Sequence, residues 1–318
     1  MNSSVLHITN GDITTNYLKS LKFQGKFITW REMLCEGKTS IDVGSESFWK
    51  TRFEFLKSSY KVTKKTFIDF TLKEYRTLCQ EKNQKEIVLW FDSDLFCQIN
   101  MIAIISWIKR FRKGEKVTMV YSHMIDDGAT QNLAFFNDLT QDQIRRHYKN
   151  RMTLSQDDIE YADYVWQLYC SNNPLRLETV HKSNPSSPFI NLTDALSLHL
   201  KRFPSTENGL NVVENFIIQT AEETKPISKH KLTERLLENQ RDFSLGYGDA
   251  QYTQKIDLLK SFFTSLHPVK LSRKGKKVLD NQLNFYRELR NEYSYLGGVK
   301  KYSYLYNNSN DKLMKITS

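Results

Sequence analysis

Short apolar runs alternate with longer amphipathic segments over the first 120 residues of the chain. Four runs rich in β-branched and aromatic residues predict strands at 5–9, 26–30, 87–91 and 117–122. Between them, apolar residues at helical spacing predict helices at 12–21, 46–60, 64–80 and 95–112. Continuous apolar strands that alternate with helices are typical of parallel βαβ units, whose strands are buried on both faces. We therefore expect an α/β domain with a mostly parallel sheet flanked by helices.

Beyond residue 122 the apolar pattern is mainly helical. The pairs Thr140/Gln143 and Ser155/Asp158 have the spacing of capping boxes, which mark helix starts. The stretch "HKSNPSSP" at 181–188 has two prolines and three serines and predicts a linker. We expect one domain at 1–180, a second at 189–285 and a polar tail at 286–318. Three helices, a short strand and a basic turn give the second domain the outline of a winged helix-turn-helix.

Charge and cysteine usage restrict the class of protein. The chain has 318 residues and a net charge of +10, and residues 221–318 hold 18 basic and 11 acidic residues, or +7 of that excess. A basic region of this kind suits weak nucleic-acid binding or only a solvated surface. The four cysteines are widely separated, which argues against a disulfide framework or a structural zinc site. We find no signal-peptide pattern and no apolar run long enough for a membrane span, so we expect a soluble cytoplasmic protein without a membrane partner.

Polar residues stand where three of the predicted strands end. In open α/β sheets, ligands bind outside the carboxyl ends of the strands, at the topological switch point. The candidates for catalysis are His7, Asp12, Glu32, Asp92 and Asp94. The candidates for ligand binding are Asn10, Gly11, Trp30, Arg31 and Glu36.

These residue types favour a metal-assisted site for a phosphate-bearing small molecule. Asp92 and Asp94 offer the oxygen ligands that a divalent cation such as Mg²⁺ prefers, and we expect this cofactor. His7 beside the carboxylates would supply an acid/base pair. Asn10-Gly11 before a helix leaves backbone N–H groups for an anion. We therefore expect Asp92, Asp94 and Asp12 to share a cleft with Glu32.

Each candidate also has a structural interpretation. Asp12 and Asp94 both precede helices, where an N-cap or first-turn acid is common. Glu32 and Arg31 suit a surface ion pair, and His7 on an apolar strand suits a hydrogen-bonded core histidine. The chain contains no phosphate-binding P-loop, dinucleotide-binding or hydrolase-elbow motif. Only convergence of the strand ends separates the two interpretations.

Two alternatives to this function remain open. One is a DNA-binding regulator that uses the basic C-terminal region, and the other is a non-catalytic interaction protein. The basic residues that would contact phosphates in the first alternative are Lys270, Arg273, Lys274, Lys276 and Lys277. A solvated turn explains the same residues equally well.

Several motifs in order resemble the bacterial family called domain of unknown function 1835. They are "LHITNGD", "ITWREMLCEG", "GSESFWKTRFEFL" and "IVLWFDSDLFCQINM". The later stretches "HYKNRMTLSQDDIEYADYVWQLYCSNNPLRL", "HLKRFPSTENGLNVVE" and "GYGDAQ" resemble the companion region of Bacteroidetes-type members, so the similarity spans 6–279. The resemblance implies an intracellular bacterial protein with an α/β domain and a helical, winged-helix-like C-terminal region, and it brings no established activity. Where that family reads "WFEYDLFCHINM", this chain has Asp92, Ser93 and Gln98, and the loss of a histidine weakens any mechanism that needs one there.

Overall fold

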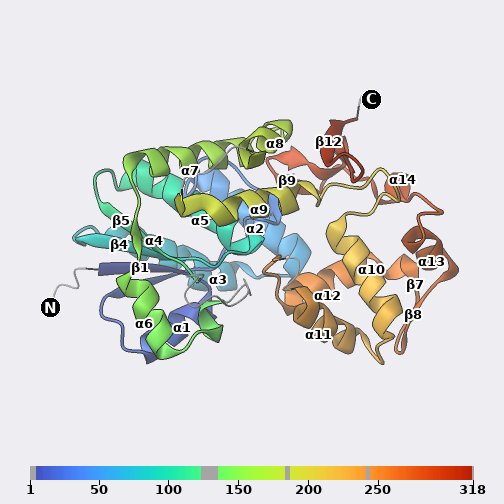
Figure 1. The fold of residues 1–318 in the computed structure, drawn as a ribbon, viewed down its shortest axis with the longest axis horizontal. Coiled ribbons are helices and arrows are strands. Elements are labelled where there is room, and N and C mark those ends of the chain that lie inside the picture. Colours follow the sequence, from blue (N-terminus) through green and yellow to red (C-terminus); the bar gives the residue numbers. More distant parts are fainter. Residues whose placement is uncertain (1–4, 123–134, 183–186, 241–243, 317–318) are drawn as a thin grey trace.

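The computed structural model of the chain has two lobes that lie side by side (Figure 1). It describes residues 5–122, 135–182, 187–240 and 244–316. The N-terminal lobe contains the large sheet, and the second lobe is mainly helical (Figure 1). This arrangement confirms the predicted α/β class with helices in the C-terminal half.

The large sheet has five strands in the order β2-β1-β4-β5-β6. Its strands are β1 (Val5–Asn10), β2 (Lys26–Trp30), β4 (Glu86–Trp90), β5 (Lys116–Val120) and β6 (Met152–Thr153). Three parallel pairings join β2, β1, β4 and β5, and β6 pairs antiparallel with β5 at one edge. In register, Ile8 pairs with Ile28 on one side and with Leu89 on the other. The prediction of a mostly parallel sheet from these four runs is confirmed.

The strand order places a topological switch point between β1 and β4. From β1 the chain moves outward to β2, then returns across the sheet to β4 and continues to β5. The helix after β1 is α1 (Asp12–Ser20), and the helix after β4 is α5 (Leu95–Phe111). These two helices cover opposite faces of the sheet, as Figure 1 shows. The carboxyl ends of β1 and β4 are therefore where a ligand of such a sheet would bind.

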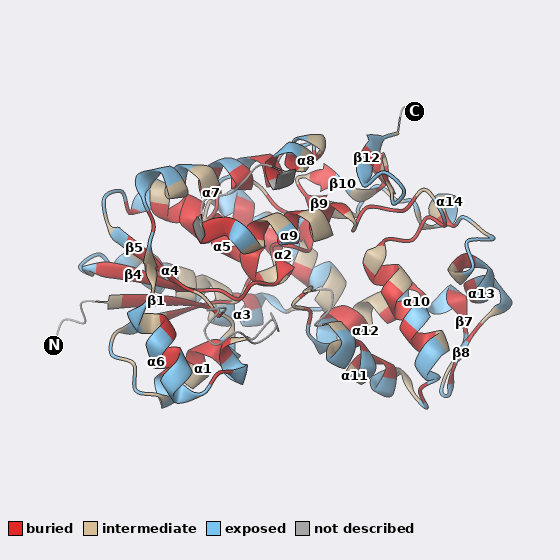
Figure 2. Cartoon of the chain, in the orientation of Figure 1, coloured by how far each residue is buried: buried red, intermediate tan, exposed pale blue. Residues whose placement is uncertain are grey.

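Helices pack on both faces of the sheet because its strands are apolar on both sides. Ile87 and Leu89 point into the larger core, whereas Val88 and Trp90 point into the smaller one. The smaller core lies under α1 and α6 (Gln141–Lys149). The larger core contains α2 (Glu46–Tyr60), α3 (Lys64–Phe67), α4 (Lys73–Gln80), α5, α7 (Gln156–Tyr169), α8 (Leu175–Lys182) and α9 (Ile190–Leu200). Figure 2 shows α5 buried along almost its whole length.

The second lobe follows the predicted order of elements. It contains α10 (Val212–Thr224), α11 (Lys229–Asn239), α12 (Asp249–Leu258), β7 (Phe263–Leu266), β8 (Val269–Leu271) and α13 (Arg273–Leu279). β7 and β8 form an antiparallel hairpin, and α12 packs against α2 of the first lobe. The winged-helix assignment itself stays a prediction.

Two segments differ from the expected division of the chain. α9, which we expected in the second domain, packs on α5 and α8. The segment expected as a polar tail contains α14 (Tyr286–Leu289), β9 (Tyr295–Gly297), β10 (Val299–Lys300), β11 (Tyr304–Asn307) and β12 (Lys312–Lys315). β9 pairs in parallel with β3 (Gly37–Lys38), so the end of the chain returns to the first lobe. The boundary at 181–188 stays a prediction, and residues 183–186 of it lie outside the described residues.

Candidate functional site at the ends of β1 and β4

Asp94 begins α5 and caps it. Its backbone is extended, and its Oδ1 accepts a hydrogen bond from the backbone N–H of Cys97 at 2.8 Å. This is the geometry of an N-cap residue, which satisfies one of the free donors at a helix start. The capping interpretation of Asp94 is therefore correct, and any further role must be added to it.

Asp92 leaves the end of β4 on the side of the smaller core. Its Oδ1 accepts a hydrogen bond from the backbone N–H of Phe136 at 3.0 Å, and Ser122 also donates to this carboxyl group. Its backbone carbonyl accepts from Nε2 of Gln98 at 2.8 Å. Asp92 and Asp94 are 8% and 3% exposed, so both carboxyl groups are buried. Among the described residues, neutral donors hold the Asp92 side chain in place.

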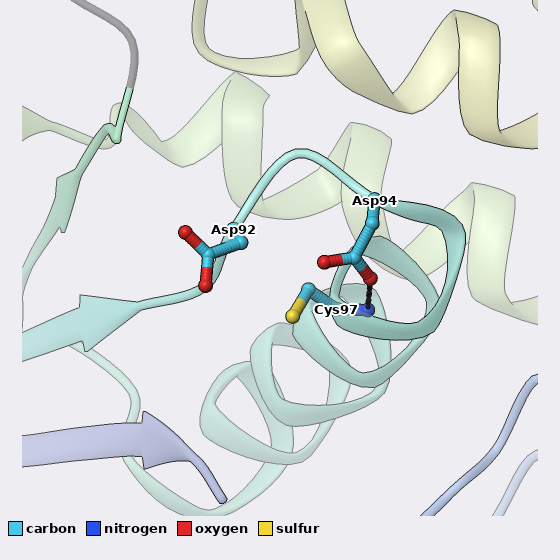
Figure 3. Close-up of side chains that lie close together, drawn as sticks. All are labelled: Asp92, Asp94 and Cys97. Atoms are coloured by element: carbon cyan, nitrogen blue, oxygen red, sulfur yellow. Dashed lines mark hydrogen bonds between the residues drawn. The ribbon is translucent and has the colours of Figure 1, made fainter. Parts of the chain in front are cut away.

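Cys97 joins the two carboxyl groups in one cluster. One ligand atom from each of Asp92, Asp94 and Cys97 lies within 4.8 Å of the other two, and Figure 3 shows the three side chains close together. Nδ2 of Asn10, at the end of β1, donates to Sγ of Cys97 at 3.1 Å. Asn100 in turn donates to Oδ1 of Asn10 at 2.7 Å. The cluster therefore sits at the switch point between β1 and β4.

The cluster brings two buried acidic side chains together without a positively charged partner among the described residues. Burial, together with the charge of Asp94, raises the pKa of Asp92 to about 8. Burial also raises the pKa of Asp94, against the hydrogen bonds from the helix start, and the pKa of the Cys97 thiol. Within the described parts of the chain, no ion pair joins Asp92 or Asp94 to a lysine, arginine or histidine. A bound cation would stabilise both ionised carboxylates.

Glu32 lies in a different place and has its own cation. Its Oε2 accepts a hydrogen bond from Nε of Arg52 at 2.8 Å, and both side chains are fully buried. Arg52 also donates to three backbone carbonyls, those of Met33, Glu36 and Lys38. Burial raises the pKa of Glu32, and the Arg52 charge opposes that rise. The expected cleft shared by Glu32 and Asp94 is not formed, because Glu32 turns inward to Arg52.

Glu36 anchors the second lobe to the first. Its carboxylate contacts Arg202, the hydroxyl of Tyr247 and Nζ of Lys255, the last at 2.6 Å. Although burial opposes ionisation, Lys255 and Arg202 hold the pKa of Glu36 at about 2. Glu36 is therefore an ion-pair residue between lobes and does not line the switch-point cluster. We call Glu36, Arg202, Tyr247 and Lys255 the lobe anchor.

Asp12 and Arg31 form a surface pair instead of lining a cleft. Two hydrogen bonds of 2.9 and 2.7 Å join the Arg31 guanidinium to the Asp12 carboxylate, whose side chain is 55% exposed. Their hydrogen bond lowers the pKa of Asp12. Arg31 also lies over the ring of Phe70, and Trp30 is a core residue beside Trp49. The predicted membership of Asp12, Trp30 and Arg31 in one site is not observed.

His7 is a core histidine with both ring nitrogens engaged. Its Nδ1 accepts from Nε1 of Trp90 at 3.1 Å, and its Nε2 lies 3.2 Å from the backbone carbonyl of Gln24. Burial lowers the pKa of His7 to about 4, so the ring is neutral at pH 7. Its ring stacks on Phe27 in the smaller core. His7 faces away from the cluster and cannot act on it.

Gly11 does not offer the expected free N–H group. Its backbone N–H donates to the carbonyl of Trp30 at 3.0 Å. Its φ of +83° places it in the left-handed region, where glycine avoids strain. The turn therefore positions Asn10, whose side chain reaches the cluster, but it does not form an anion site by itself.

The basic residues of the C-terminal region lie on the surface of the second lobe. Lys270 on β8 and Arg273, Lys274, Lys276 and Lys277 on α13 are all exposed. Lys276 pairs with Glu222 at 3.1 Å, and Lys274 lies over the ring of Phe285. Part of this charge is therefore used within the lobe.

The sequence interpretation missed Cys97 and Asn100. Cys97 follows Asp94 by three residues, a spacing that places both on the same side of a helix. That spacing was the available signal, but it gains meaning only when Asp92 is known to lie beside them. Asn100 is one further turn along α5 and also donates to the backbone carbonyl of Glu32, so it links the ends of β1 and β2 to the helix.

A separate surface cavity of about 280 Å³ lies between α5 and α7, away from these residues. Its lining includes Ile41, Trp107, Lys109, Arg110 and Phe111. Lys109 pairs with Asp163 at 2.6 Å and Arg110 with Asp42 at 2.6 Å. The charged residues of the cavity are thus already paired with one another or with neighbours.

Comparison with known proteins does not assign the chain to a family. No family model matches it, and no curated protein matches it. Among solved structures 39 chains match, and one of these is the DNA-binding, cleavage and re-ligation domain of topoisomerase II from Plasmodium falciparum. The identity is 10%, the TM-score is 0.43, and the match covers 81% of this chain and 42% of that chain. We draw no functional conclusion from a similarity at this level, and membership of the family that the sequence resembles stays a prediction.

Among the residues that the structure describes, no helix is long and apolar enough to cross a membrane.

Proposed function

We propose that the chain binds a divalent cation at the switch point of its sheet, through Asp92, Asp94 and Cys97. The observation that carries this proposal is the uncompensated cluster: three buried groups whose ligand atoms lie within 4.8 Å of one another. Burying two carboxylates without a cation is costly, so at least one is held protonated when the site is empty. A bound cation would remove that cost, because its charge would pair with both carboxylates in their present positions.

The ligand types indicate which cations to test. Two carboxylates alone would suit Mg²⁺, as expected from the sequence. The Cys97 thiol adds a sulfur ligand, and sulfur with oxygen favours Zn²⁺ or Co²⁺ over Mg²⁺. Binding must release protons, because burial raises the pKa of both Asp92 and Cys97. We therefore propose a zinc-like ion in preference to magnesium.

A phosphate-bearing ligand and a catalytic role are the finer parts of this proposal. The cation would supply the positive charge that a phosphate group needs, since no lysine or arginine pairs with the carboxylates in the described residues. A metal-held water beside a carboxyl group is a usual route to hydrolysis. We place the cation first because every further step depends on it.

The proposal is tested by cation-induced stabilisation of the wild type and three variants. A cation at 100 times its dissociation constant stabilises the folded state by about 2.7 kcal/mol, which a thermal melt detects. Asp94→Asn keeps the cap, because Asn caps helices as well as Asp, but it removes a charged ligand. We expect the melting temperature to rise with Zn²⁺ or Co²⁺ in the wild type and in Asp12→Asn, and to rise far less in Asp92→Asn and Asp94→Asn.

The control variant is Asp12→Asn, which removes a carboxylate from the surface pair with Arg31. If Zn²⁺, Co²⁺, Mn²⁺ and Mg²⁺ all fail to stabilise the wild type, the proposal is wrong. Equal stabilisation of the wild type and Asp94→Asn would place the cation elsewhere and contradict it too.

A second candidate function is weak, sequence-independent binding of nucleic acid. The exposed basic residues of α13 favour it, as does counterion release from a phosphate backbone. The geometry limits it, because α12 packs against α2 and its Lys255 is engaged by Glu36. We expect duplex binding that falls steeply with salt and whose salt slope drops by roughly 1 when Lys277 is changed to Ala. Tight, sequence-selective binding at physiological salt would favour the regulator hypothesis instead.

A further inference from the structure

A short segment of the second lobe lies directly on the switch-point cluster. This segment is Ser244–Leu245–Gly246–Tyr247, which we call the covering segment. It contacts the start of α5, about 150 residues earlier in the chain, through its backbone. The contact raises the question of how a ligand reaches Asp94.

The covering segment uses the donors that begin α5. The backbone N–H of Leu95 donates to the carbonyl of Ser244 at 2.8 Å, and that of Phe96 donates to the carbonyl of Leu245 at 3.3 Å. The next N–H, that of Cys97, is used by Asp94. The first N–H groups of a helix lack intrahelical partners and commonly bind anions or polar ligand atoms. Here carbonyl oxygens from the other lobe occupy those positions.

Gly246 places the covering segment against the Asp94 carboxylate itself. A Cβ added at Gly246 would lie 2.1 Å from Oδ1 of Asp94 and 2.4 Å from its Cγ, which no side chain could tolerate. The φ of Gly246 is +70°, in the left-handed region. Glycine therefore permits a contact so close that no ligand atom fits between the segment and Asp94.

Tyr247 ties the covering segment to the lobe anchor. Its hydroxyl donates to Glu36, and its backbone exchanges two hydrogen bonds of 2.8 and 2.9 Å with the side chain of Gln240. The side chains of Leu245 and Tyr247 are also buried in the large core, so moving the segment must expose them. Its centre at Gly246 has no side chain to pack.

We infer that the covering segment is a displaceable cover, which must leave the start of α5 before a ligand can reach Asp94. The inference rests on the proposed function, because it assigns regulation to the same site. It explains why the cluster is so deeply buried although it lies at the ligand-binding edge of the sheet. Contacts between the lobes then control access to the site, with Glu36 and Tyr247 holding it closed.

The cover can be tested without any ligand, through the reactivity of Cys97. In the closed form Cys97 is 5% exposed. A small alkylating reagent followed by peptide mass spectrometry gives the labelling rate of each cysteine separately. Cys79, which is half-buried on α4 beside Tyr75, is the internal control, because a change in its labelling reports opening of the first lobe itself.

Two variants loosen the cover in different ways. Gly246→Ala forces the segment away from Asp94, and Tyr247→Phe removes one hydrogen bond to Glu36 while Arg202 and Lys255 remain. We expect Cys97 labelling to rise about tenfold or more in Gly246→Ala and by a smaller factor in Tyr247→Phe, since Tyr247→Phe loses a single hydrogen bond. Cys79 labelling should not change in either variant.

Unchanged Cys97 labelling in both folded variants would overturn the inference, and so would a parallel rise at Cys97 and Cys79. Adding Zn²⁺ to Gly246→Ala separates this test from the proposed function. If Zn²⁺ then protects Cys97, both hold. If the variants open but Zn²⁺ gives no protection, the cover stands as a moving segment and the cation proposal fails.

Discussion

Two buried acidic clusters in the described part of the chain differ in whether their carboxylates have a positively charged partner. At Glu32 and Glu36 each carboxylate meets a guanidinium or ammonium group, from Arg52, Arg202 or Lys255. At Asp92 and Asp94 the partners are backbone N–H groups, a hydroxyl and a thiol. Both clusters are equally buried, so burial alone does not separate a structural cluster from a candidate site.

The difference is visible in the pKa values. Arg202 and Lys255 hold the pKa of Glu36 at about 2 despite its burial, whereas burial beside Asp94 raises the pKa of Asp92 to about 8. A group whose pKa is strongly raised by burial and a neighbouring charge is a candidate functional group. Glu32 lies between these cases, because its single cation, Arg52, only opposes the effect of burial. Charge compensation is therefore the better guide to which acids hold the fold together.

The largest change in the free energy of unfolding is expected when Arg52, the partner of Glu32, is replaced. Changing Arg52 to Met leaves Glu32 buried without its cation and leaves three backbone carbonyls without a donor. Removing one partner of a buried pair usually costs about 3–5 kcal/mol. We expect urea denaturation to show a loss of this size or failure to fold, at any cation concentration. A loss below about 1 kcal/mol would mean that the pair is not structural.

The ion pairs of Glu32 and Glu36 also show which part of the site could not be predicted from the sequence. The apolar alternation predicted all four parallel strands to within two residues at each end, since strand and helix periods are local properties. Asp92 and Asp94 stayed together because only Ser93 lies between them and Asp94 is the N-cap of α5. Glu36 did not join them, since its partner Arg202 is 166 residues away and no local pattern reports it. Long-range ion pairing therefore decided which of the predicted acids entered the site.

At Asp92 we expect that removing the ionisable group stabilises the folded protein, whereas removing Arg52 destabilises it. In the folded protein Asp92 keeps its proton up to about pH 8, whereas in the unfolded chain it loses it near pH 4. The stability that this proton contributes is present below pH 4 and is lost as the pH rises towards 8. With a chelator present, Asp92→Asn should therefore be more stable than the wild type at pH 8, by on the order of 3 kcal/mol, and the gap should shrink at pH 5.

Chemical denaturation at both pH values measures this difference. Asn can still accept from the N–H of Phe136, so the fold should persist. A destabilised Asp92→Asn at pH 8 in chelator would show that the ionised carboxylate is already compensated, and the comparison between the clusters would fail.

His7 offers a third way to bury a titratable group, by keeping it neutral. Burial lowers its pKa to about 4, while the unfolded value is near 6.5. The stability linked to His7 is therefore present above pH 6.5 and is lost as the pH falls towards 4. Relative to His7→Gln, the wild type should lose about 2 kcal/mol between pH 7 and pH 5. Parallel pH profiles of the two proteins would show that His7 is not held neutral.

The smallest change in stability is expected at Asp12, whose carboxylate has a positively charged partner but lies at the surface. Its carboxylate is paired with Arg31 as those of Glu32 and Glu36 are paired, but its side chain is 55% exposed. Water and salt screen such a pair, so it contributes less than about 1 kcal/mol. Because Arg31 lowers the pKa of Asp12, this small contribution is present above pH 4 and is lost as the pH falls below it.

Asp12→Asn should therefore lower the stability slightly at pH 7 and low salt, and not at all at pH 2–3 or in about 1 M salt. Denaturation curves under the three conditions measure this, with cation stabilisation as a second readout. The cation effect should equal that of the wild type, since Asp12 turns to Arg31 and away from Asp94. If Asp12→Asn abolishes cation stabilisation while its stability stays normal, Asp12 reaches the site when a cation is bound. The cleft expected from the sequence would then form only in the bound state, and pairing with Arg31 would have to be exchangeable.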